Sequence, residues 1–538
     1  MASITRQHVG KYTYLYESVS FRDELGRPRN KKTKIGKLDL KTGLPVYLPE
    51  YLERMAAQGT PVEVPQLPEK EPENDWNKVV EQTLDSVKSY GAFHLFHELA
   101  KENGLLELLR EVFPDKCNEI FSLASFLVES NEPVMYCEDW ASRTATLPIG
   151  TLSSQRISEL LSEITVEQRN AFYQAWNQRN QEDGYIALDI TSISSYSQLM
   201  KSCEWGYNRD HENLPQINLC MLFGEESMLP VYQTAYTGSL KDVTTLQTTL
   251  AEVTALNPDK ELRIVMDKGF FSAKNIDRLL HADRTIHFLI SVPFTSFFAK
   301  KQVESERKDI DCLANTILTG DGVIRGVHKI RSWEKRGDKL HTFVYFNPEK
   351  QMKERNDLFR FVTELYQEAL LNPHHPKFAQ DFQKYLIIRK SSSAPNGYTI
   401  SIREDVIEKQ LATCGWMVLV SDSLDDPQKA IDIYRHKDVV EKSFDRLKNA
   451  LDLHRLRIHS DDRLDNKLFL GFIAQILISS IHLRMKHNRL YRKFSIHKLL
   501  RRLSSLLSAS VNGRFFLRPL SRELKDIFSA FHIPLPVG

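Results

Sequence analysis

The sequence predicts an α/β protein with a mixed central sheet flanked by helices. Two short apolar runs, 185–191 and 262–267, each carry an aspartate near their end. Such runs are typical of strands that are buried on both faces. Strand patterns alternate with helical patterns along most of the chain, and no internal repeat is evident. These observations together favour a layered fold of strands and helices over an all-helical or all-β fold.

The first third of the chain precedes this α/β pattern. Residues 1–50 predict a basic β unit, because the tyrosines of 12–16 alternate and a Gly-Arg-Pro turn follows. Residues 51–75 are rich in proline and acidic side chains and predict a linker. Residues 76–180 predict a helical region that contacts DNA, with Ser153 as one helix N-cap.

The α/β core is predicted in two pieces. Residues 181–293 supply a strand, a hairpin, a helix, a strand, a second helix and a further strand. Residues 416–490 supply the last strand and helices of the core. Between them, 294–415 is less regular and predicts a β-rich insertion. Residues 491–538 predict a basic, helical C-terminal tail that contacts DNA or a partner protomer.

Bulk composition narrows the class of protein. The 538 residues carry a formal net charge of only +2, yet basic segments stand at both ends of the chain, which suits a polyanionic partner. The six cysteines are scattered without a Cys-x-x-Cys pair, so a reducing cytoplasm fits better than a zinc or disulfide framework. No signal-peptide pattern is present. The apolar run 468–483 contains Gln475 and predicts a buried helix, with no membrane partner.

The segment 434–448 predicts one continuous helix with two stripes, because it lacks glycine and proline. The apolar stripe, predicted to be buried, comprises Val440, Phe444, Leu447 and Leu451. The adjacent polar stripe comprises Tyr434, Lys437, Glu441 and Lys448. On such a face the carboxylate could bind a metal ion and the two ammonium groups could bind phosphates. The alternative is a solvated, salt-bridged helix face.

Asp189 and Asp267 each lie near the end of a predicted buried strand, where a charge is costly unless it is paired or bound to metal. Neighbouring strands would bring both to one rim, and Glu441 could complete a triad. Three carboxylates suit Mg²⁺ or Mn²⁺, and two ions roughly 3.5–4 Å apart would support phosphoryl transfer. Asp189 would bridge both ions. The alternative for each aspartate alone is a cap on the loop after its strand.

At these residues the chain resembles bacterial insertion-sequence transposases of the DDE type with a YREK signature. That signature is similar to the spacing of Tyr434, Lys437, Glu441 and Lys448, with Lys437 in the arginine position. Lysine cannot form the bidentate fork of arginine, so Arg435 is an alternative. Further resemblance lies in 206–216, in the hairpin and loop around Pro230, Tyr236, Gly238 and Asp242, and in the turn 267–270.

The resemblance implies an RNase H-like core with a β-rich insertion. It implies metal-dependent cleavage at the ends of an insertion sequence and strand transfer into target DNA, with Asp189, Asp267 and Glu441 as catalytic metal ligands. Tyr434, Arg435, Lys437 and Lys448 would contact DNA, and Trp333 could stack on a flipped base or simply pack in the core. The implied partners are terminal inverted repeats, target DNA and a second protomer, in a bacterial cytoplasm at the nucleoid.

Two other functions fit the same residues. A related RNase H-like nuclease or resolvase would share the triad but would not join strands. A non-catalytic DNA-binding derivative would need none of the three carboxylates.

Overall fold

The computed structural model of the chain describes residues 2–40, 42–65, 76–130, 132–180, 182–197, 199–210, 212–256, 258, 261–282, 286–320, 322–333, 337–394, 397–449, 455–458, 460–511 and 514–537. The chain divides into two compact units, residues 1–82 and 83–538. Each is described by itself below.

The first unit is an antiparallel sheet closed by a helix. Its elements are β1 (Ala2–Val9), β2 (Tyr12–Arg22), β3 (Pro28–Leu38), β4 (Pro45–Tyr47) and α1 (Pro49–Ala57). Leu15, Ile35 and Tyr51 form its small core. Tyr51 belongs to α1, so the folded unit extends beyond residue 50. Residues 51–57, which the sequence predicted to be part of a linker, are helical in the structure. Residues 66–75 of that linker lie outside the described residues.

The helical region of the second unit packs into the main core. Its helices are α3 (Gly91–Glu102), α4 (Leu105–Val112), α5 (Cys117–Ser130), α6 (Cys137–Arg143), α7 (Ser154–Glu163) and α8 (Val166–Arg179); α2 (Trp76–Ser86) precedes them. Ser153 caps α7 as predicted, because its side chain accepts a hydrogen bond from the Arg156 amide.

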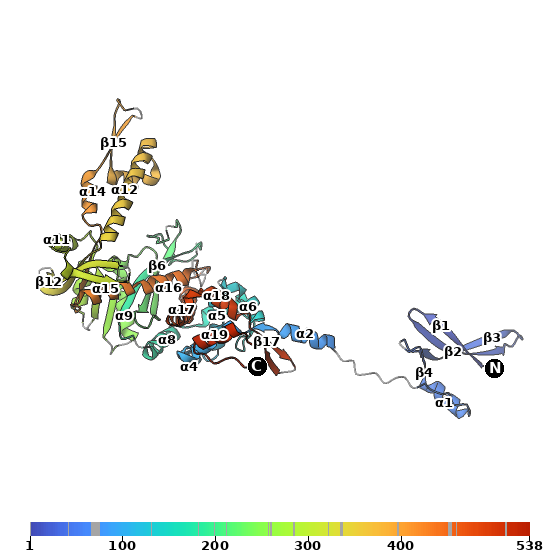
Figure 1. Ribbon diagram of the computed structural model, residues 1–538. Helices are drawn as coiled ribbons and strands as arrows, with labels where there is room; N and C mark the ends of the chain where they lie inside the picture. Colours follow the sequence, from blue (N-terminus) through green and yellow to red (C-terminus); the bar gives the residue numbers. More distant parts are fainter. Residues whose placement is uncertain are drawn as a thin grey trace. The chain divides into compact units, whose positions relative to one another are not determined.

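A single mixed sheet organises the second unit (Figure 1). Along the sheet the order is β8 (Pro230–Thr237), β7 (Gln216–Gly224), β6 (Ile186–Ser194), β9 (Leu262–Met266), β10 (Ile286–Ser291), β16 (Trp416–Ser421), β13 (Asp338–Phe346), β12 (Gly322–Trp333) and β11 (Thr316–Thr319). Strands β6, β9 and β10 are parallel, and β7 and β16 run antiparallel to their neighbours. The first five strands have the order of an RNase H-like core, which confirms the predicted fold class.

Helices cover both faces of this sheet. On one side, Thr249 of α9 (Asp242–Leu256) approaches the sulfur of Cys220 on β7. Asp189 and Met221 are directly paired and therefore share the opposite face, which α16 (Asp438–Asn449) covers. The remaining helices of the core are α10 (Ala273–Leu280), α15 (Pro427–His436) and α17 (Leu464–His487).

Helix α17 is the buried helix predicted from its apolar run. By length and composition the segment Asp461–His487 could cross a membrane, but 78% of its most apolar window is buried inside the protein. The Gln475 amide donates to the backbone oxygen of Ser443 in α16. Helix α17 therefore supports the helix that carries Glu441.

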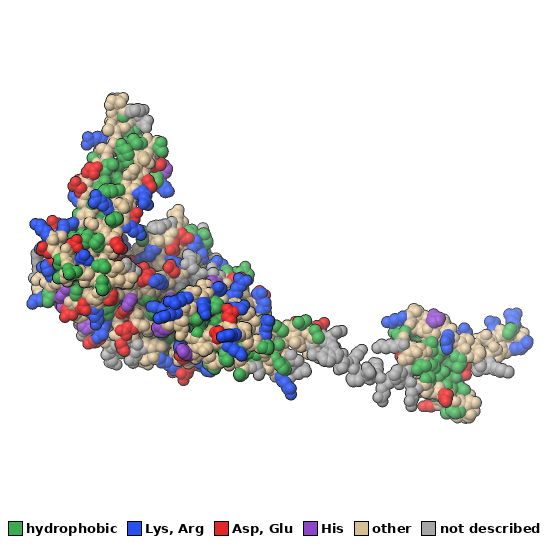
Figure 2. All heavy atoms as spheres, viewed as in Figure 1, with side chains coloured by type: hydrophobic (Ala, Val, Ile, Leu, Met, Phe, Trp, Pro, Cys, Tyr) green, Lys and Arg blue, Asp and Glu red, His purple; other side chains and the backbone are tan. Residues whose placement is uncertain are grey.

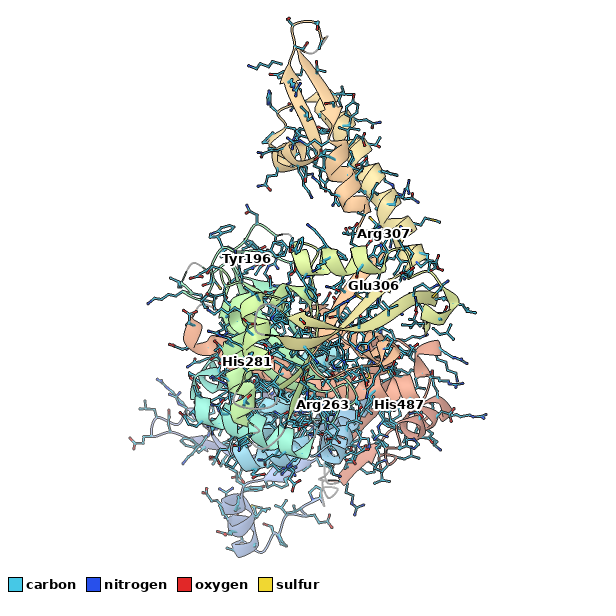
Figure 3. The ribbon with its side chains drawn as sticks, turned by 90° about the vertical axis from the view of Figure 1, so that its left-hand side faces the viewer. Tyr196, Arg263, His281, Glu306, Arg307 and His487 are labelled. Carbon is cyan, nitrogen blue, oxygen red and sulfur yellow. The ribbon has the colours of Figure 1, made fainter. Side chains whose placement is uncertain are left out.

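The segment between β10 and β16 has two parts. Strands β11–β13 extend the main sheet, whereas α12 (Pro348–Leu371), α13 (Ala379–Tyr385), β14 (Leu386–Lys390), β15 (Tyr398–Ile402) and α14 (Glu404–Leu411) have a small core of their own. At the base of this second part lies the end of α11 (Phe297–Glu306) (Figure 3). There Glu306 pairs with Lys329 at 2.7 Å and Arg331 at 2.9 Å, and Arg307 donates to the oxygen of Ala412 at 2.5 Å.

The C-terminal segment is helical only in part. Helix α18 (Ile496–Leu503) buries Leu499, Leu500 and Leu503 and exposes Lys498 and Arg501. Figure 2 shows Lys and Arg side chains gathered over α17 and α18. A hairpin of β17 (Leu507–Val511) and β18 (Arg514–Leu517) then pairs with β5 (Lys88–Ser89), before α19 (Arg522–Ala530).

Candidate active site

Asp189 of β6 and Asp267, the residue directly after the parallel strand β9, lie at neighbouring positions. Leu188 of β6 pairs with Met266 of β9, and each aspartate is the next residue along its strand direction. Both strands are buried among apolar neighbours, so their register is fixed by the core. This register places the two aspartates beside each other, although Asp189 is the fourth of the nine residues of β6 and not at the strand end that the sequence predicted.

Glu441 reaches the same place from α16 through Lys437. The ammonium of Lys437 lies 2.7 Å from Glu441 Oε1 and 3.9 Å from Asp189 Oδ2. The two carboxylate oxygens are therefore no farther apart than the sum of these distances. The Lys437 side chain is only 5% exposed, whereas that of Glu441 is 57% exposed. Glu441 is the member of the group with the most room to turn.

The predicted helix 434–448 is interrupted in the structure. Helix α15 ends at His436, Lys437 stands at the junction, and α16 begins at Asp438. The Val440 amide bonds to the Lys437 oxygen, an i to i+3 contact that tightens the chain at this point. The prediction of one continuous helix was wrong because no glycine or proline marks a break that tertiary packing imposes.

The apolar stripe of this segment is confirmed where it is described. Val440, Phe444 and Leu447 are buried against the core. Leu451, the fourth predicted member, lies outside the described residues.

Tyr434 fixes the second aspartate. Its phenol donates to Asp267 Oδ1 at 3.2 Å, and the Asp267 carboxylate also accepts from the Lys268 amide at 2.7 Å. Burial, together with the nearby Asp267, raises the pKa of Tyr434, so the phenol keeps its proton and remains a donor. Tyr434 thus orients a carboxylate in this structure.

The three carboxylates share one electrostatic environment. Burial raises the pKa of Asp189 to about 6, and the negative charges of Asp267 and Glu441 act in the same direction against the ammonium of Lys437. Burial alone would lower the pKa of Lys437, but Asp189 and Glu441 outweigh it, and the pKa is raised. A buried cation therefore balances clustered acids at this rim.

The donor set fits a divalent metal ion of the magnesium type, because it consists of hard carboxylate oxygens around a position that already holds a positive charge. Among the described residues, no three His, Cys, Asp or Glu side chains are yet arranged as a ligand set. Asp189 and Glu441 are instead joined through Lys437. Holding an ion between them requires the exposed Glu441 side chain to turn and Lys437 to give up one contact.

The other predicted DNA-contacting residues have different surroundings. Lys448 is buried and bonds both oxygens of Asp210 at 2.6 and 2.8 Å, so its ammonium does not face solvent. Arg435 lies beside Tyr434 on a small pocket of about 140 Å³ that includes Lys350 of α12.

The prediction that Trp333 stacks on a flipped base does not fit the structure. Its side chain is 4% exposed, and its indole nitrogen donates to Asp277 at 2.9 Å. Its ring packs edge-on against Phe271 and Phe298. Trp333 is a core residue, which was the alternative interpretation of this tryptophan.

Two ion pairs that connect the site to its neighbouring loops were missed from the sequence. Lys448 with Asp210 links α16 to the loop after β6, and Arg209 with Asp242 at 2.5 Å links the same loop to the start of α9. In each pair the two partners lie far apart in the chain. Their only signal was membership of segments that match family motifs.

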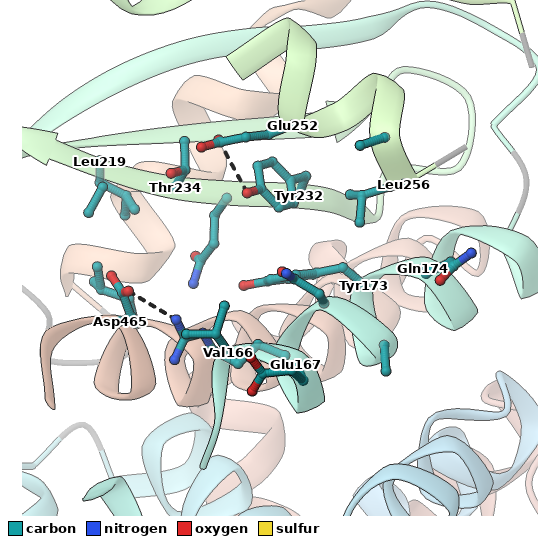
Figure 4. Close-up of a pocket in the computed structure, with 17 residues that line it drawn as sticks. Val166, Glu167, Tyr173, Gln174, Leu219, Tyr232, Thr234, Glu252, Leu256 and Asp465 are labelled. Carbon is teal, nitrogen blue, oxygen red and sulfur yellow. Dashed lines mark hydrogen bonds and ion pairs between the residues drawn. The ribbon is translucent and has the colours of Figure 1, made fainter. Parts of the chain in front are cut away.

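A separate cavity of about 680 Å³ lies at the β8 end of the sheet (Figure 4). It is lined by α8, β8, α9 and the start of α17, with Tyr232 bonded to Glu252 and Arg169 paired with Asp465. None of the three carboxylates lines it.

The sheet thus has the strand order of an RNase H-like core, with Asp189 on β6, Asp267 directly after the parallel strand β9 and Glu441 on the covering helix. Residues 180–477, more than half of the chain, match the family described as the transposase DDE domain. The chain belongs to this family: it is a transposase that acts on DNA, and its function is DNA transposition. The family uses divalent metal ions.

Among curated proteins no relative matches the sequence. Among solved structures, the cryo-EM structure of a piggyBac transposase synaptic complex with hairpin DNA is similar with a TM-score of 0.34 and 12% identity. That similarity covers 82% of this chain and 77% of that chain.

Proposed function

We propose that Asp189, Asp267 and Glu441 are the catalytic carboxylates of a transposase that cleaves insertion-sequence ends and transfers the strand into target DNA. The observation that supports this assignment is the buried ammonium of Lys437 between Asp189 and Glu441, with Asp267 on the adjacent strand. Three acids that share one cation site are the arrangement that metal-dependent phosphoryl transfer requires.

The assignment gives each residue a distinct task. Asp189 would help to hold both Mg²⁺ or Mn²⁺ ions, and Asp267 and Glu441 would each hold one. Such ions activate water or a 3′-hydroxyl and stabilise the leaving oxygen. Tyr434 keeps Asp267 oriented by donating to it. Lys437 would neutralise a DNA phosphate at the same rim.

Other contacts with DNA follow from charge. We propose that Arg435 meets a phosphate near the insertion and that the basic face of α18 contacts DNA or a second protomer. Lys448 positions the loop after β6 through its ion pair with Asp210. The DNA partners are terminal inverted repeats and target DNA, bound by a homodimer in the bacterial cytoplasm at the nucleoid.

A cleavage and joining assay tests this assignment. The full chain is incubated with labelled DNA from the flanks of its gene and with a supercoiled plasmid, in Mg²⁺ or Mn²⁺. Asp189→Asn, Asp267→Asn and Glu441→Gln should each reduce cleavage at least a hundredfold while leaving DNA binding intact. The matched control is Asp438→Asn, an exposed carboxylate on the same helix that pairs with Lys442. Substantial cleavage by any of the three site variants removes that residue from the triad.

The product distinguishes the rival functions. A transposase joins labelled ends to the plasmid, whereas a nuclease or resolvase gives cut ends without joined product. A non-catalytic derivative gives neither product in any divalent metal.

A further inference from the structure

The loop between β6, the strand that carries Asp189, and β7 exposes large aromatic side chains. Tyr196, Trp205 and Tyr207 are 73%, 63% and 76% exposed. Large rings are usually buried in a protein that has an apolar core available to them. Three such exposed rings on one loop offer flat apolar faces to a ligand. The loop is described apart from residues 198 and 211.

The backbone under these rings is held firmly. The oxygen of Tyr207 accepts from Ser192 at 3.4 Å and from Gln216 at 2.9 Å, so it is tied to both strands. The next residue, Asn208, is buried; its amide nitrogen donates to Ser194 at 3.0 Å, and its amide oxygen accepts from the backbone. A ring presented on a fixed backbone loses little conformational freedom on binding.

Close packing also joins this loop to the loop that precedes α9. A Cβ at Gly206 would lie 1.9 Å from the oxygen of Gly238. Figure 3 shows Tyr196 at the outer surface of the β6–β7 loop. The backbone near Trp205 and Tyr207 is therefore set by two strands and a neighbouring loop.

The same loop is attached to the catalytic elements. Arg209 pairs with Asp242, whose carboxylate is so close to Gly269 that a Cβ there would lie 2.8 Å away. Gly269 is two residues after Asp267. On the other side, Asp210 pairs with Lys448, seven residues after Glu441, or roughly 10 Å along the helix axis.

The surroundings of the rings suit nucleic acid, because the chain belongs to a family that acts on DNA and this loop is tied to the elements that carry the proposed catalytic acids. The guanidinium of Arg455 lies 5.3 Å from the centre of the Tyr196 ring, and Lys201 is exposed on the same loop. Aromatic rings interleaved with cations are the usual surface for unpaired bases and their phosphates. Arg455 already pairs with Glu212 at 2.6 Å, so the choice of nucleic acid rests on the exposed Lys201 and on the ion pairs that tie this loop to the elements beside Asp267 and Glu441.

We propose that Tyr196, Trp205 and Tyr207 form a stacking surface that holds unpaired bases of the DNA strand beside the active site. The proposal rests on the proposed function, because it places that strand at the carboxylate rim. Stacking requires ring faces and no particular base, so it confers preference for unpaired DNA over sequence specificity.

Binding without catalysis tests the proposal. The full chain is titrated, in EDTA, with two labelled oligonucleotides of one sequence: a blunt duplex and the same duplex with a 3′ single-stranded overhang. Tyr207→Ala and Trp205→Ala should each weaken binding of the overhang DNA about tenfold while leaving the blunt duplex within twofold. Tyr207→Phe should bind like the wild type, because it keeps the ring. The matched control is Phe297→Ala, which removes a ring that is 79% exposed on α11.

Three outcomes would overturn the stacking surface. These are unchanged binding of overhang DNA, equal losses on both DNAs, or dissociation of a dimer on size-exclusion chromatography of Trp205→Ala. Melting temperatures within two degrees of wild type confirm that the variants are folded. Since the titration needs no metal, a negative result leaves the triad untouched. Conversely, if the catalytic assignment is wrong, Asp189→Asn will retain cleavage.

Discussion

Replacing Asp189 with asparagine should remove cleavage and at the same time stabilise the metal-free protein. Burial raises the pKa of this carboxyl from 3.8 to about 6. The folded protein therefore holds the proton more tightly than the unfolded chain does. The free energy of unfolding falls as the pH rises from about 4 to 6, and it stays lower above pH 6.

The size of the effect follows from that shift. Each pKa unit corresponds to about 1.4 kcal/mol, so the ionised carboxylate costs about 3 kcal/mol at neutral pH. The Asp189 side chain is 18% exposed, and little of this cost is screened by solvent. Asp189→Asn should raise the melting temperature by several degrees at pH 7.5 in EDTA, and the gain should disappear near pH 4.

Scanning calorimetry between pH 4 and pH 8 measures this gain. The control is Asp445→Asn, an exposed carboxylate on α16, which should shift the melting temperature by less than one degree. Adding Mn²⁺ should stabilise the wild type and not Asp189→Asn. An unchanged or lower melting temperature for Asp189→Asn at pH 7.5, or a gain that does not depend on pH, would refute the electrostatic account of this site.

Three further predictions concern residues whose surroundings only the structure shows. Lys448→Met should destabilise the protein by about 1–3 kcal/mol, and a double-mutant cycle with Asp210→Asn should show coupling in chemical denaturation; additive effects would contradict the pairing. Trp333→Ala should lower the melting temperature by removing a buried ring worth about 3–5 kcal/mol, yet leave second-strand cleavage normal at low temperature; a cleavage defect with wild-type stability would restore its role in stacking. Lys498→Gln with Arg501→Gln should weaken DNA binding and reduce the slope of log affinity against log salt by about 1–2; an unchanged slope would show that α18 does not contact DNA.

Local patterns were sufficient to predict the elements around the site. The apolar run that contains Asp189 and the run that ends at Asp267 are short and continuous, and such runs become central strands wherever they pair. Once both strands lie parallel in one sheet, their carboxyl ends must share a rim. The burial of Val440, Phe444 and Leu447 likewise follows from helical spacing alone.

Side-chain partners could not be predicted in the same way. The charged stripe of α16 gives no sign that Lys437 is buried between two acids or that Lys448 faces Asp210 instead of solvent. The sequence allows Trp333 to be a core ring or a stacking ring, and only its neighbours decide between the two. In each case the partner comes from a distant part of the chain.

The sequence by itself determined the class of fold, the strand that carries each aspartate and the helix that carries the glutamate, because hydrophobic periodicity is a local property of the chain. Tertiary structure alone decided which charges are buried, where the segment 434–448 breaks and which aromatic rings remain exposed. The physical reason is that desolvation and ion pairing depend on contacts between residues far apart in sequence, and those contacts exist only after the sheet and its covering helices have packed.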